Sequence, residues 1–168
     1  MDTSEVYIKQ IMKLTIELVP KTSWYANLRK SLPKRWNEIR KLTYQYYNYH
    51  CSICGGKGPK WPVECHEVWN YSDRLHIQAL VALQALCPAC HLVKHIGFAR
   101  VSGRLHEAIQ QLMKVNNIDE RAANSEISKA MDRWEERSMF TWEVDTSDLD
   151  FILQSMKTVV DERKNKNE

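Results

Sequence analysis

The chain has 168 residues, of which 43% are hydrophobic and 27% are charged, a composition that excludes a disordered or low-complexity protein. The net charge is only +3, but residues 1–104 carry 15 Lys and Arg against seven Asp and Glu, whereas residues 105–168 carry nine against 14. This asymmetry predicts that the first two thirds face a polyanion such as DNA. Because no apolar run approaches the length of a membrane span and no signal-peptide core is visible, we expect a cytoplasmic protein with no membrane partner.

Taken in chain order, the apolar spacing and the turn residues predict an α+β fold in which helices predominate. Charged residues every four positions and the following Pro20 indicate a first helix over Ser4–Val19. We then expect a short helix or turn over 23–33, a helix over 33–47, a turn over 55–59, an extended segment over 60–71, and a buried strand or apolar connector over 80–86. A helix opened by Pro88 carries His91 and His95 and ends near Gly97. Helices over 104–116 and 119–138, a strand over 140–145 and a last helix capped by Ser147 complete the chain.

This order predicts three parts of one compact unit: an N-terminal helical part (1–50), a central zinc module (51–104) and a C-terminal helical part (105–168). In the last part Leu105, Ile109, Leu112 and Met113 repeat at helical spacing, which is typical of a stripe that faces the core. We therefore expect the acidic C-terminal part to be architectural.

Four of the five cysteines form two C-x-x-C pairs, Cys51 with Cys54 and Cys87 with Cys90. A two-residue spacer lets both thiolates of a pair bind one ion, and two pairs supply the four ligands of a closed tetrahedral zinc site. The 32 residues between the pairs are enough for a hairpin. The sequence therefore predicts a structural zinc ion that contributes to folding.

Further metal-seeking side chains surround the second pair and the extended segment. His91 and His95 stand four residues apart on the predicted helix, so that their rings share one face and can bind a second divalent ion. The segment "VECHEVW" holds Glu64, Cys65, His66 and Glu67 in a row. On a strand Glu64 and His66 point to one side, and Cys65 and Glu67 to the other.

The strings "CSIC", "ECHEVW" and "LQALCPACHLVKH" together resemble the HNH endonucleases of the ββα-metal type, over about Cys51 to Gly97. The flanking segments are similar to those of bacterial and phage proteins of this kind. The resemblance implies a β-hairpin packed on a helix, a structural zinc ion at its base, and one catalytic divalent ion (Mg, Mn, Ni or Zn) between hairpin and helix. It implies that His66 is the general base and that His91 and His95 bind the catalytic metal.

Two positions depart from the family pattern. Cys65 stands where the family has Asp or His as a metal ligand, and Ala82 stands where it has Asn. The residues "ECHE" can be aligned with the family motif in two registers. In the first register, which we prefer, His66 is the base and Glu64, Cys65 or Glu67 completes the metal site. In the shifted register His66 is a third ligand and Glu67 is the base.

The resulting hypothesis is an endonuclease that cleaves or nicks DNA. The main alternative is an HNH-like zinc module with weakened chemistry that binds nucleic acid or a protein partner, which the two departures favour. A structural zinc ribbon with incidental histidines is a third interpretation.

Basic and aromatic side chains near the motif are candidates for nucleic-acid contacts. The basic ones are Arg74, Lys94, Arg100 and Arg104, which lie close to the motif in sequence and can hold phosphates without reading bases. Of the aromatic residues, Trp69 and Tyr71 follow the histidine segment and are candidates for stacking on bases. We expect four other tryptophans to pack in the core: Trp24, Trp36, Trp134 and Trp142.

Overall fold

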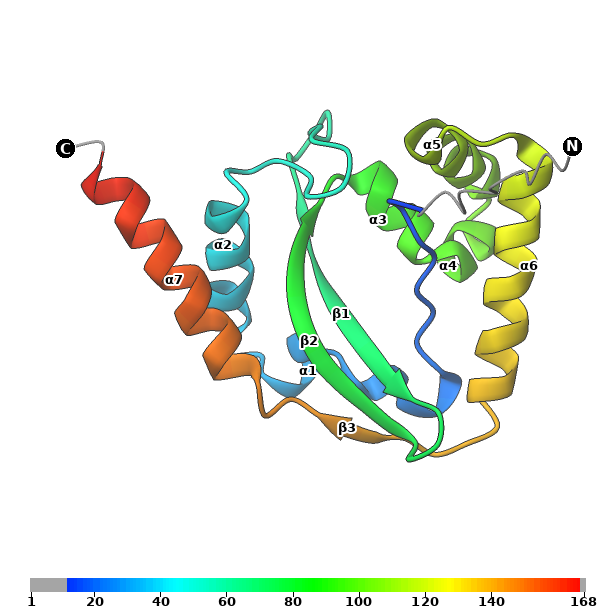
Figure 1. Ribbon diagram of the computed structural model, residues 1–168, viewed down its shortest axis with the longest axis horizontal. Coiled ribbons are helices and arrows are strands. Elements are labelled where there is room, and N and C mark those ends of the chain that lie inside the picture. Colours follow the sequence, from blue (N-terminus) through cyan, green and yellow to red (C-terminus); the bar gives the residue numbers. More distant parts are fainter. Residues whose placement is uncertain (1–11, 167–168) are drawn as a thin grey trace, which may run out of the picture.

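The computed structural model describes residues 12–166 and confirms an α+β fold in which helices predominate around a small sheet (Figure 1). The N-terminal half contains the 3₁₀ helix η1 (Lys21–Ala26), α1 (Leu28–Ser31), α2 (Trp36–Tyr46) and the strands β1 (Glu64–Ser72) and β2 (Ile77–Leu86). The C-terminal half contains α3 (Pro88–Lys94), α4 (Ile96–Val101), α5 (Leu105–Asn116), α6 (Glu120–Arg137), β3 (Glu143–Asp145) and α7 (Leu149–Asn165).

A long, curved hairpin of β1 and β2 forms the centre of the molecule (Figure 1). The two strands are antiparallel, with Glu64 opposite Leu86 and Ser72 opposite Ile77, and their register shifts at Val68/Trp69. The predicted extended segment and the predicted strand over 80–86 are both confirmed as parts of this hairpin. The expected strand over 140–145 shortens to β3, which pairs in parallel with the start of β2 and leaves β1 as an edge strand.

Two apolar clusters lie on either side of the hairpin. One packs α2 and α7 against the strands, and its buried residues include Ile39, Leu80 and Leu153. The other surrounds α3 and is closed by α5 and α6 (Figure 1). In α5 the predicted stripe faces this second cluster, since Leu112 is fully buried and its three partners pack against the cluster. The hairpin is thereby held from both sides, and α3 is fixed at its base.

The N-terminal helix is the main error of the sequence prediction. From residue 12 to residue 20 the chain is irregular, and residues 4–11 of the predicted helix lie outside the described part. The backbone amides of Lys13 and Leu14 donate instead to Asn116 Oδ1 (2.9 and 3.0 Å), and the Glu17 amide donates to the carbonyl oxygen of Lys94 (3.1 Å). These partners lie far away along the chain, so the segment is held by α5 and α3 rather than by its own turns.

Two helix ends also differ from expectation. The helix opened by Pro88 ends at Lys94, and His95 adopts a non-helical conformation between α3 and α4. The last helix begins at Leu149 with Asp148 in the N-cap position, so the expected cap by Ser147 is wrong; the Ser147 amide donates to Asp145 Oδ1 (2.8 Å). The expected helices over 33–47, 104–116 and 119–138 are present as α2, α5 and α6, the last capped by Asp119.

The tryptophan expectation holds only in part. Trp142 is buried, but Trp24 keeps 59% of its surface exposed and stacks on Trp134 with ring centroids 6.5 Å apart. Within residues 12–166, no helix combines the length and the apolar character that a membrane span requires.

Candidate metal centres

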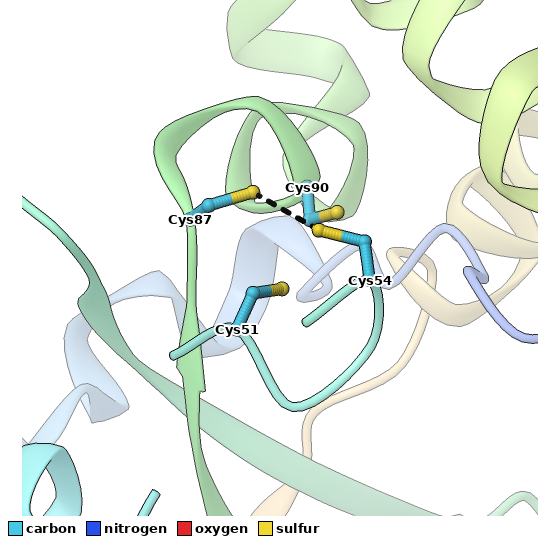
Figure 2. A group of neighbouring side chains, drawn as sticks. All are labelled: Cys51, Cys54, Cys87 and Cys90. Carbon is cyan, nitrogen blue, oxygen red and sulfur yellow. Dashed lines mark hydrogen bonds between the residues drawn. The ribbon is translucent and has the colours of Figure 1, made fainter. Parts of the chain in front are cut away.

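The two cysteine pairs converge at the base of the hairpin. Cys51 and Cys54 lie in the loop before the hairpin, and Cys87 and Cys90 lie at the start of α3 (Figure 2). Their sulfur atoms all lie within 4.8 Å of one another, and those of Cys54 and Cys87 are 3.7 Å apart. Zn–S bonds of about 2.3 Å in a tetrahedron place the sulfurs about 3.8 Å apart. The four thiols therefore have the separation that a tetrahedral zinc site needs.

The local backbone positions these sulfurs. Pro88 begins α3 directly after Cys87, which sets the first turn of the helix and brings Cys90 back over Cys87. In the opposite loop the amide of Gly55 donates to the Cys51 carbonyl (2.9 Å), and Gly55 has a φ of +72°, which favours glycine. Hydrogen bonds from the Cys87 and Cys90 side chains lower the pKa of Cys51, whereas the same contacts with Cys51 raise the pKa of Cys87 and of Cys90, so without a metal the cluster favours one thiolate, on Cys51.

A second cluster is formed by three histidines, one from β1 and two from the α3 region. Ring nitrogens of His66, His91 and His95 lie within 4.8 Å of one another. The Nε2 atoms of His91 and His95 are 3.1 Å apart, close to the separation of about 3.3 Å for two nitrogens on one tetrahedral ion with bonds of about 2.0–2.1 Å. The end of α3 at His95 does not separate the pair. This donor set suits a divalent transition metal with an open position.

Two of the three histidines each have one ring nitrogen within hydrogen-bond distance of a carboxylate. Glu64 Oε2 lies 2.6 Å from His91 Nδ1, and Glu17 Oε2 lies 2.8 Å from His66 Nε2. Histidines that bind metals commonly donate their second ring N–H to a carboxylate, which fixes the tautomer and the ring orientation. The ring nitrogen that is not bonded to a carboxylate is therefore Nε2 in His91 and Nδ1 in His66.

Glu17 lies outside the Cys51–Gly97 motif. The spacing of charged residues in the N-terminal segment predicts it to be on the solvated face of a helix. In the structure its carboxylate also forms an ion pair with Lys94, whose side chain is only 3% exposed and whose ammonium donates to Thr15 Oγ1 (3.0 Å). Burial alone would raise the pKa of Glu17, but the hydrogen bonds from His66 and Lys94 lower it to about 2. Glu17 therefore stays ionised beside His66.

Burial keeps His66 and His95 neutral. His66 is 4% exposed, and desolvation lowers its pKa more than the bond to Glu17 raises it. For His95, burial and the neighbouring His91 lower the pKa to about 3. A neutral imidazole is the form that accepts a proton or binds a metal.

The other two side chains of the "ECHE" segment point away from the histidines, as the predicted alternation requires. Cys65 lies against Thr43 of α2 (Sγ to Oγ1, 3.6 Å), and burial raises the pKa of its thiol to about 12, so it stays protonated. Glu67 Oε1 accepts a hydrogen bond from the Leu28 amide (2.7 Å), and burial raises its pKa to about 7. The structure thus brings Glu64 and His66 to the cluster and places Cys65 and Glu67 on the opposite side of the strand.

The basic candidates are divided by their surroundings. Lys94 is buried and paired with Glu17, which contradicts its prediction as a phosphate contact. Arg104 pairs with Glu107 at the surface (2.7 Å). Arg74 and Arg100 are both exposed, and Arg100 lines the cavity that contains the histidines.

No protein-family model, curated protein or solved structure matches this chain.

Proposed function

We propose that the protein is an HNH-type, metal-dependent endonuclease that cleaves or nicks DNA phosphodiester bonds. One observation carries this proposal: three histidines from the hairpin and the following helix converge, and two of them are oriented by carboxylates. The hairpin–helix order and the cysteine cluster at its base agree with the ββα-metal arrangement that the sequence resembles.

His66 has the surroundings of a general base. In the neutral ring, the carboxylate of Glu17 favours the tautomer with its proton on Nε2, and Nδ1 then carries the free lone pair. Nδ1 accepts a proton from a water molecule as the water oxygen attacks phosphorus. The bond from phosphorus to the 3′-oxygen then breaks, and the leaving oxygen takes up a proton from solvent. A positioned base of this kind contributes ~10²–10⁴-fold to the rate.

His91 and His95 are the residues that would hold the catalytic ion. A bound divalent ion would supply positive charge against the phosphate oxygens, which is the largest electrostatic requirement of phosphoryl chemistry. Glu64 fixes the ring of His91 for this purpose. The four cysteines would hold zinc and keep the hairpin and α3 together.

Two departures from the family pattern favour a second candidate, a zinc module that binds nucleic acid or a protein partner without cutting. Cys65, at the position of a family metal ligand, is a buried thiol that faces α2, and the hairpin has Ala82 in place of the family's Asn. The histidine centre would then have fewer ligands than an active nuclease.

Cleavage by the purified zinc-loaded protein separates the two candidates. Single-stranded and duplex DNA are incubated with Mg²⁺, Mn²⁺, Ni²⁺ or added Zn²⁺, and wild type is compared with His66→Ala. His106→Ala, which changes an exposed histidine of α5, is the matched control. We expect wild type and the control to cut and His66→Ala not to cut. If wild type cuts nothing with any of the ions, the binding module replaces the nuclease.

A further inference from the structure

The histidine cluster lies in a cavity of about 1380 Å³. This volume exceeds the 300–1,000 Å³ or so of a site for one small molecule. Its wall runs from His66 on β1 along residues 17–19 to Trp24 of η1 and Phe98 of α4. A cavity of this size with the candidate chemistry inside it suits a segment of a polymer better than a single metabolite.

Exposed aromatic side chains line this cavity on three different elements. Trp24 of η1 and Phe98 of α4 are each 59% exposed, and Trp61, in the loop before β1, is 45% exposed. Each of these rings presents a large apolar surface to solvent at the cavity wall, and it is their position on three elements around one recess that sets them apart from exposed rings elsewhere, such as Phe151. Flat, exposed rings are what single-stranded nucleic-acid sites use to stack unpaired bases.

The charges of the cavity are complementary to a phosphate backbone. Its three carboxylates, on Glu17, Glu64 and Glu67, are already bonded to a histidine or to a backbone amide. Arg29 and Arg100 also line the cavity, are exposed, and form no ion pair within the described part of the chain. Arg40, Lys60 and Arg104 line the cavity as well, so its wall carries five basic side chains against three carboxylates, and its net charge is positive.

A buried donor lies in the same cavity. Gln78 is fully buried and its Oε1 accepts a hydrogen bond from Ser23 Oγ (2.7 Å), but its Nε2 has no hydrogen-bond partner among residues 12–166. Burying an amide donor without a partner is costly, so such groups commonly mark a place for a ligand atom or water.

His66 lies deep in the cavity, whereas His91 and His95 are partly exposed. His66 is 4% exposed, and residues 17–19 of the N-terminal segment contribute to the wall beside it. A phosphate of a stiff double helix reaches only groups that protrude into a groove, whereas a single strand can bend into a recess and turn its bases outward. The aromatic rim would have no exposed base face to contact in a stacked duplex.

We propose that the strand bound in this cavity is single-stranded DNA, with its bases on the aromatic rim and its phosphates between the arginines and the histidines. This inference rests on the proposed nuclease function and adds its substrate class.

Binding without cleavage tests it. Zinc-loaded protein, with no second metal added, is titrated into a fluorescein-labelled single-stranded oligodeoxynucleotide, the duplex of the same sequence, and the matching RNA strand. We expect the single DNA strand to bind at least ten-fold more tightly than the duplex. Phe98→Ala should weaken that binding by about 5- to 150-fold, the effect of losing one stacked base. Arg100→Ser should weaken it less, and more at low salt than at high salt.

The matched controls are Phe151→Ala and Arg121→Ser, which change exposed residues of α7 and α6 outside the cavity wall. Duplex or RNA binding as tight as that of the DNA strand would overturn the inference, as would equal losses for Phe98→Ala and Phe151→Ala. If the strand binds as expected but is never cut with any divalent ion, the nuclease proposal fails and the binding inference stands.

Discussion

The ion pair between Glu17 and Lys94 should hold the N-terminal segment on the histidine centre, and a double-mutant cycle measures its strength. Glu17→Gln and Lys94→Met each remove one charge while they nearly preserve the shape of the side chain. In the double variant neither charge remains. The cycle isolates the pair from the other contacts of each residue.

The magnitude follows from burial. The Lys94 side chain is 3% exposed and that of Glu17 is 32% exposed, so Glu17→Gln leaves a buried ammonium group without its counter-charge. Removing one partner of a buried pair costs about 3–5 kcal/mol, and we take about 3 kcal/mol because Glu17 is partly solvated. The double variant should be more stable than the sum of the two losses predicts, by at least about 2 kcal/mol.

Urea unfolding of the zinc-loaded variants gives the four free energies of unfolding. The exposed pair of Arg104 and Glu107, whose side chains are 45% and 50% exposed, is the control cycle and should give a coupling below ~1 kcal/mol. If the coupling of Glu17 with Lys94 is as small as that of the control, the segment is not held by this pair and the assignment of Glu17 as the partner of His66 loses its basis.

The remaining predictions concern the two centres. The protein should retain close to one zinc ion per chain, as measured by elemental analysis. Cys51→Ser or Cys87→Ser should leave the protein unfolded in circular dichroism, because much of the ~10–16 kcal/mol of zinc-binding energy is lost. Cys65→Ser, the control, should keep the zinc. His91→Ala or His95→Ala should lower the affinity for the catalytic ion, so that excess metal restores part of the activity, whereas metal should not rescue His66→Ala; the reverse order would support His66 as a third ligand. Glu67→Gln should keep activity, because the side chain faces away from the histidines, and a loss of activity as large as that of His66→Ala would restore the shifted register. Burial raises the pKa of Glu67 from 4.5 to about 7, so between these pH values the folded chain binds a proton that the unfolded chain has lost. The free energy of unfolding should therefore fall as pH rises from about 4.5 to about 7. In urea titrations Glu67→Gln should reduce this fall.

The parts of the molecule that depend on local pattern were predictable from the sequence. Two C-x-x-C pairs predict one cluster of sulfurs, because the spacer lets each pair turn onto a common ion. The alternation along Glu64–Glu67 predicts which side chains share a face, and the hairpin obeys it. The apolar stripe of α5 and the Asp119 cap of α6 are equally local.

The contribution of Glu17 depends on contacts that spacing does not encode. The charged residues at every fourth position in the N-terminal segment fit a solvated helix. The described part of this segment is instead held by Asn116 and Lys94, both far away in the sequence. The β-branched residues Thr15, Ile16 and Val19 just before Pro20 are a weak signal against a helix. A buried lysine has no sequence signal of its own, because lysine is almost always exposed unless it is paired.

Cleavage by the histidine centre is the central claim, and one measurement tests it most directly. Zinc-loaded wild type, His66→Ala and His106→Ala are incubated with a single-stranded DNA substrate and with plasmid, each with Mg²⁺, Mn²⁺, Ni²⁺ or added Zn²⁺. We predict that wild type and His106→Ala cut with at least one of these ions, and that His66→Ala is slower by ~10²–10⁴-fold at saturating metal with its zinc content unchanged. Cutting by His66→Ala at the wild-type rate, or no cutting by wild type under any of these conditions, would contradict the account.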